Sequence, residues 1–461
     1  MSDLVLRNAR LVFPHRGVVE GEVGISDGRI DAVGKDLGRG GREIDLHGAL
    51  LGPGIVDPHT HVGIYRPADQ DARTESECAV RGGVTTMVTY WRVGEPYTDG
   101  LVPYGRAFPD FRAQLDGRMS VDYAVNLGML TRAHLAEVPE LVRKEGVTTL
   151  KYFAHYEGRP DIGHDLDSGY FYALAEAVAR LRPDHPAVRL SVHSEDAYIV
   201  REATDREKQR RGTDLESYRR SRPELAEAVA IARLGETALA TGAPVYLPHV
   251  SSALGYSRAA EYAARGADLL IETSLHYLTL TTGSPAGILA KVNPAVRREE
   301  DVEALWSALG RGGLRCVGSD HASNARAEKT ELWSAKPAFA GTGLLLPLLF
   351  EEGVVRRRLL TPESLWGILA ENNAKAHGLF PRKGALVPGA DADLVAVEKL
   401  AEPRRVTAES VHSAADYSPY EGRELHYAPT RTFLRGELVA DESGLHAPGR
   451  GQYLRRPLGP A

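Results

Sequence analysis

The stretch Asp57-Pro58-His59-Thr60-His61 comes directly after the apolar run 49–56, which glycine and proline interrupt. Successive side chains of a strand point to opposite faces, so a strand here places His59 and His61 on one face and Thr60 on the other. Two imidazoles on one face can bind a single metal ion. One His-x-His pair is weak support by itself, because histidine pairs are common on strands, so a metal site requires further ligands elsewhere in the chain.

Four later residues have the character that such a site needs, because each is polar or chargeable and ends a short apolar stretch. They are Lys151, His193, His249 and Asp320. In a parallel barrel the carboxyl ends of the strands gather on one face, where the active site lies. The pattern therefore predicts one site that combines these four residues with the two histidines of the first strand.

Length, charge and cysteine content limit the class of protein. A chain of 461 residues suits a barrel with a second, smaller domain. A net charge of −6 provides no basic field for nucleic acid or anionic lipid, and no apolar run is long enough to cross a membrane. Cys78 and Cys316 cannot form a disulfide framework, and the start of the sequence has no signal-peptide pattern. We expect a cytoplasmic protein without nucleic-acid or membrane partners.

Apolar strands alternate with helical stretches through the middle of the chain, which favours parallel βα units and a (β/α)8 barrel. The expected helices and the strands that follow them are 74–82 with 84–89, 132–144 with 147–151, 170–182 with 188–193, 225–241 with 245–249, 254–265 with 268–273, and 299–310 with 315–320. Both chain ends instead read as short strands and turns, with hairpin signals at Asp27-Gly28 and Arg435-Gly436. The tail after Gly444 is expected to pack on a surface or a neighbouring subunit, or to be disordered.

Five motifs in this order resemble the amidohydrolase superfamily, and within it the cyclic amidases dihydropyrimidinase, hydantoinase and allantoinase. The motifs are 53–61, 82–87, 249–252, 317–321 and 384–395. The resemblance implies an α/β protein with a TIM-like (β/α)8 barrel and a small β-sandwich built from both chain ends. We expect residues 1–53 to form the first part of the sandwich, 54–380 the metal-dependent barrel, and 381–461 the second part and the tail.

Four histidines and an aspartate suit divalent ions such as Zn²⁺, but an ammonium group cannot bind a cation. Lys151 matches the position of a lysine that, in this family, carries CO₂ on its side-chain nitrogen. The resulting carbamate bridges two metal ions. The alternative for Lys151 is an ordinary ion pair. By the same resemblance, His59, His61 and Asp320 bind the more buried ion, and His193 and His249 bind the second.

The resemblance also implies catalytic and substrate-binding residues. Asp320 transfers the proton of the attacking water, and Tyr156 hydrogen-bonds the developing oxyanion; a packing role is the alternative for Tyr156. Backbone groups of Asn293 and Ala338 hold the ring amide. Four other histidines are expected to be structural or solvent-exposed, and they are His155, His164, His276 and His321.

The sequence departs from its relatives two residues after the second histidine, where dihydroorotases typically carry arginine and allantoinases asparagine. In this sequence the position is Gly63, which counts against both dihydroorotate and allantoin as the substrate. Tyr65 is predicted to pack as an aromatic wall against a substituent of the substrate ring, together with Trp91 and Phe153. Arg66 is predicted either to bind a substrate anion or to pair with nearby carboxylates.

The sequence thus predicts a hydrolase of carbon–nitrogen bonds that uses two divalent metal ions to open a hydantoin, dihydropyrimidine or related cyclic amide. A hydrolase of another cyclic amide, such as allantoin, is the near alternative. Two further alternatives are a non-catalytic scaffold and a mononuclear deaminase. The presence of all six metal-ligand residues counts against the scaffold, and the bridging lysine counts against the deaminase. Resemblance also implies a homotetramer.

Overall fold

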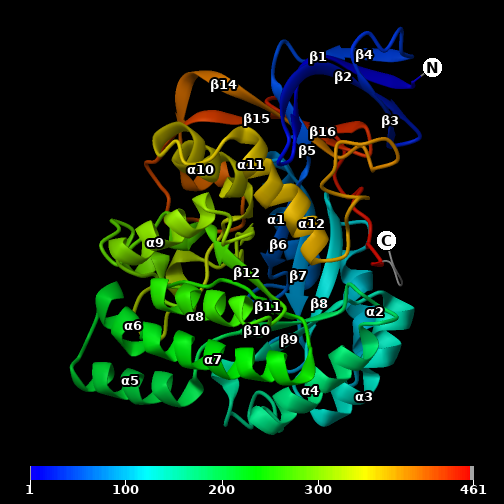
Figure 1. The fold of residues 1–461 in the computed structure, drawn as a ribbon. Helices are drawn as coiled ribbons and strands as arrows, with labels where there is room; N and C mark the ends of the chain where they lie inside the picture. The colour runs from blue at the N-terminus through cyan, green and yellow to red at the C-terminus, as the bar shows by residue number, and fades with distance from the viewer. Residues whose placement is uncertain (1, 457–461) are drawn as a thin grey trace.

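The computed structural model describes residues 2–456, and its central element is an eight-stranded parallel sheet. The strands follow one another in chain order as β6 (Ile55–Thr60), β7 (Val84–Trp91), β8 (Asp122–Gly128), β9 (Thr149–Phe153), β10 (Arg189–His193), β11 (Val245–Leu247), β12 (Leu269–Ser274) and β13 (Cys316–Gly318). The side-chain amide of Asn373 donates to the carbonyl oxygens of Val56 and Val317 and so joins the first strand to the last. The predicted barrel is confirmed (Figure 1).

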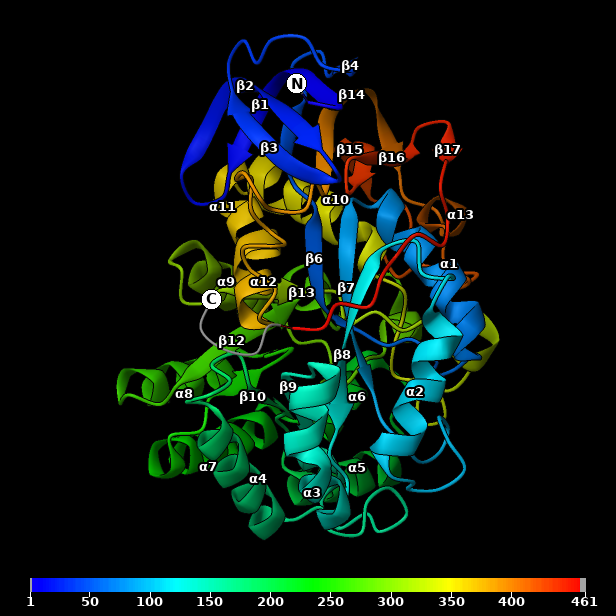
Figure 2. The same cartoon turned by 90° about the vertical axis from the view of Figure 1, so that its right-hand side faces the viewer.

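Helices surround this sheet (Figures 1 and 2). They are α1 (Ala68–Arg81), α2 (Tyr104–Leu115), α3 (Arg132–Glu140), α4 (Ser168–Leu181), α5 (Ala197–Gln209), α6 (Leu215–Ser221), α7 (Glu224–Thr241), α8 (Ala253–Ala264), α9 (Glu299–Gly310), α10 (Leu345–Leu349), α11 (Pro362–Trp366), α12 (Asn373–Ala376) and α13 (Ala408–Val411). Short π-helical segments are η1 (Leu141–Glu145), η7 (Phe350–Arg356) and η8 (Gly367–Asn372), and 3₁₀ turns are η2 (Ala154–Tyr156), η3 (Leu275–Leu278), η4 (Gly287–Ala290), η5 (Arg326–Glu328) and η6 (Thr342–Leu344). All six expected helix–strand pairs are present.

Strand β8 and helix α2 were not predicted. The helix contains Pro109, which breaks the usual helical pattern. The strand carries Asp122 and Asn126, both fully buried, so it lacks the continuous apolar run of a strand in a parallel barrel.

The two chain ends form one mixed nine-stranded sheet at the top of Figures 1 and 2. Its strands are β1 (Leu4–Phe13), β2 (Gly17–Ser26), β3 (Arg29–Gly34), β4 (Arg42–Asp45), β5 (Leu50–Pro53), β14 (Leu394–Arg405), β15 (Glu424–Leu434), β16 (Glu437–Asp441) and β17 (Gly444–Leu445). Strand β5 pairs antiparallel with β14, and Leu6, Val23, Leu394 and Phe433 share one core. We propose that 1–53 and 381–461 form one domain and 54–380 the barrel, a division that this pairing supports.

Both predicted hairpin turns are present. Asp27 and Gly28 have φ of 51° and 74°, and Arg435 and Gly436 have φ of 47° and 76°. Positive φ at both central residues is the geometry of a type I′ turn, whose twist matches that of the flanking strands.

A buried lysine lies between the barrel and the sheet of the chain ends. The Lys383 ammonium is 2.5 Å from Asp122 of β8, 2.9 Å from Asp391 and 2.6 Å from Asp393. These three carboxylates are close enough together to hold a metal ion. Because the ammonium already lies among them, we interpret the group as an ion-pair network that joins the two domains.

Residues 449–456 pack along the barrel, which agrees with the first of the alternatives expected for the tail (Figure 2). The Tyr123 amide donates to the Gln452 carbonyl, and the Leu454 amide donates to the Tyr123 carbonyl. Arg456 is 1% exposed and donates to the side chain of Asn126 at 2.9 Å. An arginine-rich sequence suggests exposure, but here buried oxygen acceptors satisfy the guanidinium. Within residues 2–456 no helix is long and apolar enough to cross a membrane.

Candidate metal centre and active site

One cavity of about 120 Å³ at the carboxyl ends of the barrel strands is lined by every residue that the sequence predicted for the site. These are His59, His61, Lys151, His193, His249, Asp320, Tyr65, Tyr156, Asn293 and Ala338. The structure thus brings together residues that lie up to 279 positions apart in the chain, from His59 to Ala338. Their individual roles stay predictions.

The first strand and the last meet around Asp320. One carboxylate oxygen of Asp320 is 3.2 Å from Nε2 of His59 and 3.2 Å from Nε2 of His61. These three residues form a group with the spacing of metal ligands. Asp320 has φ of 50°, an unusual value for a residue other than glycine. Strained backbone of this kind clusters at functional sites.

Lys151 and the other two histidines complete the ring of donors. The ring centroid of His249 lies 5.2 Å from that of His59 and 4.5 Å from that of His193. The Lys151 side chain is 2% exposed, and its nitrogen lies 4.6 Å from the centre of the Tyr90 ring. This nitrogen is buried without a hydrogen-bond partner among the described residues. A buried lysine nitrogen without a hydrogen-bond acceptor is consistent with a nitrogen that carries a further chemical group, such as a carbamate.

Burial controls protonation in this cavity. It lowers the pKa of His59 and of His193 to about 4, so both imidazoles are neutral at pH 7 and available to bind metal. Burial also lowers the pKa of Lys151 to about 7, so a large share of the amine is neutral. Burial alone would raise the pKa of Asp320, but His59 and His61 help to hold it well below its usual value. The donors therefore have the protonation states that metal binding requires.

Two buried glutamates that the sequence interpretation missed contact the predicted ligands. His193 donates from Nε2 to Glu195 at 2.6 Å, which leaves Nδ1 for a metal ion, and Glu195 also pairs with Arg222. Glu272 lies 3.4 Å from Nδ1 of His59. Burial raises the pKa of Glu272 to about 8. A carboxylate such as Glu195, which holds the second nitrogen of a ligating histidine, fixes the orientation of the ring and increases metal affinity.

Glu195→Gln should lower the affinity for Zn²⁺ by about 10- to 100-fold, because the amide no longer presents a charged acceptor to His193. Competition with a chelator of known affinity measures this loss. Glu157→Gln is the matched control, since Glu157 is buried and pairs with Arg233 but contacts none of the predicted ligands. Equal Zn²⁺ affinity in the two variants would contradict the assigned role of Glu195.

Aromatic side chains close the cavity. Tyr156 packs 5.3 Å from Phe153 and 3.9 Å from His155 between ring centroids. His155 differs from its expectation, because it lines the cavity and its ring centroid lies 3.8 Å from that of His193. The Tyr218 hydroxyl donates to the side chain of Asn293 and fixes that residue at the rim.

The other three candidate histidines lie outside the cavity lining. His164 is exposed, and His276 is buried and packs edge-on against Tyr277. His321 is buried 2.9 Å from Glu75 of α1, so it anchors the loop that carries Asp320.

The loop that follows β6 has no side chain at residue 63 and a paired arginine at 66. Gly63 has φ of 84°, and a Cβ there would lie 2.8 Å from that of Ala68, so the position favours glycine. Arg66 lies 3.5 Å from Asp71 and 3.6 Å from Glu75. The ion-pair alternative for Arg66 is therefore confirmed.

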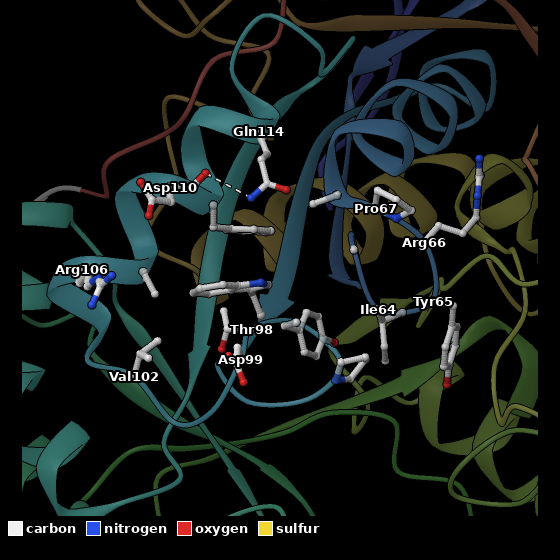
Figure 3. Close-up of a pocket in the computed structure, with 17 residues that line it drawn as sticks. Ile64, Tyr65, Arg66, Pro67, Thr98, Asp99, Val102, Arg106, Asp110 and Gln114 are labelled. Atoms are coloured by element: carbon white, nitrogen blue, oxygen red, sulfur yellow. Dashed lines mark hydrogen bonds between the residues drawn. The ribbon is translucent and has the colours of Figure 1, made fainter.

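A larger hollow of about 700 Å³ lies beside the site cavity and shares part of its lining. Figure 3 shows Ile64 and Tyr65 on the loop after β6, and Arg106 and Gln114 on α2 across the hollow. Ile64, Tyr65, Trp91 and Tyr97 line both spaces, so they form the wall between them.

Four imidazoles, a carboxylate and a buried amine without a partner fit divalent metal ions. A (β/α)8 barrel that places these donors at the carboxyl ends of its strands defines a metal-dependent hydrolase. The chain belongs to the amidohydrolase family, whose sequence profile matches residues 50–439.

Similarity to individual proteins extends over nearly the whole chain. A D-hydantoinase from Geobacillus stearothermophilus is 30% identical over 95% of this chain and 93% of its own length. An allantoinase from Salmonella newport is 29% identical over 98% of both chains. A crystal structure of D-hydantoinase superposes with a TM-score of 0.90 at 28% identity and covers 98% of both chains.

Proposed function

We propose that this protein hydrolyses an amide bond of a cyclic amide, such as a hydantoin or a dihydropyrimidine, with two divalent metal ions. The observation that carries the proposal is the single cavity that holds all six predicted ligands together with Tyr156. The similarity to D-hydantoinase over nearly the full length supports the same substrate class.

The donors suggest how the ions are held. We propose Zn²⁺ because imidazole and carboxylate ligands suit it, with His59, His61 and Asp320 on one ion and His193 and His249 on the other. Lys151, carboxylated on its nitrogen, would bridge them; the neutral amine that burial favours is the form that reacts with CO₂. When bound, the two ions would lower the pKa of a water molecule and polarise the substrate carbonyl.

The chain's own residues would then move the proton and stabilise the charge. Asp320, which accepts a hydrogen bond from His61 and lies 3.2 Å from Nε2 of His59, would take the proton of the attacking water and return it to the leaving nitrogen. The Tyr156 hydroxyl would donate to the carbonyl oxygen as it becomes negative. Backbone groups of Asn293 and Ala338 at the rim would hold the ring amide, and Tyr65 would pack beside it.

A panel of cyclic substrates tests this proposal with purified protein loaded with Zn²⁺. We expect 5-substituted hydantoins or dihydrouracil to be hydrolysed. Dihydroorotate should not be hydrolysed, because residue 63 has no side chain to bind its ring carboxylate. Failure of every hydantoin and of dihydrouracil would contradict the proposal, and efficient hydrolysis of dihydroorotate would contradict the interpretation of Gly63.

Allantoin belongs in the same panel as a second candidate. The match to an allantoinase over 98% of both chains favours it, whereas Gly63 in place of asparagine counts against it. A kcat/KM for allantoin above that for every hydantoin would replace the first proposal by the second.

We also propose that the enzyme is a cytoplasmic homotetramer. The two buried, free cysteines, Cys78 and Cys316, support a reducing compartment. The similarity to cyclic amidases supports the tetramer, and light scattering at micromolar concentration should give a mass near four chains. A mass near that of one chain would contradict it.

A further inference from the structure

Arg92 is held in the lining of the site cavity. It is the first residue after β7, is half-buried and lines the cavity. Its guanidinium donates to the carbonyl oxygens of Val93 at 2.9 Å and Glu95 at 2.7 Å. Its Cζ also lies 5.3 Å from the centre of the Tyr97 ring. These contacts fix the guanidinium at the cavity instead of leaving it free in solvent.

This guanidinium has no carboxylate within 4 Å among residues 2–456, in contrast to the paired Arg66. Two of its five N–H groups serve the two carbonyl contacts, which leaves three. The only carboxylate that lines the cavity is Asp320, which His59 and His61 contact on the floor. The cavity lining therefore presents an oriented positive charge without a protein counter-ion.

A second cation lies nearby. The Lys336 ammonium is 5.2 Å from the centre of the Tyr65 ring, and the next two residues, Pro337 and Ala338, line the cavity. Lys336 likewise has no carboxylate within 4 Å in the described part of the chain. An unpaired cation beside a residue of the cavity wall adds to the attraction for an anionic substrate.

We propose that Arg92 binds a carboxylate on a side arm of the ring substrate, so that the preferred substrates are cyclic amides with an acidic substituent. This inference rests on the proposed function and narrows its substrate class. Guanidinium groups bind carboxylates through paired N–H donors, and three such donors remain on Arg92.

Strand register indicates how long the arm must be. Trp91 pairs with Leu127, and Gly128 pairs with Lys151, so Arg92 lies level with Lys151 and two strands away. Strands are about 4.8 Å apart, which places the two backbones about 10 Å apart. Because the guanidinium is bound to carbonyls of the loop beyond β7, an arm of a few carbons is needed. By this spacing we expect a carboxylate attached directly to the ring, as in dihydroorotate, to fall short of the guanidinium.

The test compares 5-(2-carboxyethyl)hydantoin with the neutral 5-(2-carbamoylethyl)hydantoin, which has nearly the same shape. For the Zn²⁺-loaded wild-type protein we expect kcat/KM to favour the carboxylate by about tenfold or more, chiefly through KM, and the preference to shrink as salt is added. Arg92→Gln should abolish the preference, because kcat/KM for the carboxylate substrate falls to about the value for the amide substrate. Arg92→Lys should keep part of it, and Arg66→Gln should keep all of it.

A purely structural role for Arg92, as an anchor of loop 93–95, predicts instead that Arg92→Gln slows both substrates equally. That result, or a preference that survives in Arg92→Gln, would overturn the inference while hydrolysis of the amide substrate still supports the proposed function. If neither substrate is hydrolysed, calorimetry with the carboxylated hydantoin decides: binding to wild type that Arg92→Gln weakens about tenfold supports the carboxylate site, and equal or absent binding overturns it.

Discussion

Replacing Lys151 by alanine should remove most of the bound metal and lower kcat/KM by about 1,000-fold or more, while the barrel still folds. The side chain is 2% exposed at the end of β9, and its nitrogen has no hydrogen-bond partner among the described residues. A bridging carboxylate between two cations contributes several kcal/mol to the site, and each 1.4 kcal/mol of activation free energy is a factor of ten in rate. Elemental analysis gives metal per chain, and circular dichroism reports the fold.

Two further measurements separate a bridging carbamate from a simple positive charge. Lys151→Arg keeps the charge but cannot be carboxylated in the same way, so it should be as inactive as the alanine variant. Acetate or propionate with excess Zn²⁺ should restore part of the activity of Lys151→Ala by occupying the gap. Full activity with two metal ions per chain in Lys151→Ala would end the bridging proposal.

Asp320→Asn should lower kcat by about 100- to 10,000-fold with little change in KM, because the amide cannot accept the proton of the attacking water. Asparagine tolerates positive φ, so the backbone at 50° should be retained. The side chain also keeps its size beside His59 and His61, so the fold should be unchanged.

Steady-state kinetics with metal analysis on the same preparation checks this prediction. Metal content has to be measured because Asp320 is also a proposed ligand, and the kcat comparison holds for fully loaded protein. A loaded Asp320→Asn enzyme with at least a tenth of the wild-type kcat would show that another group transfers the proton.

The sequence predicted most of the barrel because its strands are apolar and end in chargeable residues. Alternation placed His59 and His61 together, and the same strand-end position predicted Lys151 and Asp320 as their neighbours. Strand β8 was missed because buried Asp122 replaces an apolar residue there, and its counter-ion, Lys383, is 261 positions away.

The supporting residues of the site were missed for a related reason. Glu272 approaches His59 across 213 residues of sequence, and no spacing rule connects them. Arg92 differs from Arg66 only in its surroundings, because one lacks a carboxylate neighbour and the other has two. Which arginine is free to bind substrate is decided by tertiary contacts.

The packing of residues 449–456 against β8 has a consequence for biosynthesis. Domains generally fold as the chain leaves the ribosome, amino-terminal part first. Here Tyr123 and Asn126 are made more than 300 residues before Gln452, Leu454 and Arg456, which bond to them. The third barrel strand therefore gains these partners only after residues 449–456 have left the ribosome, and a chain that stops before residue 449 would leave Tyr123 and Asn126 without them.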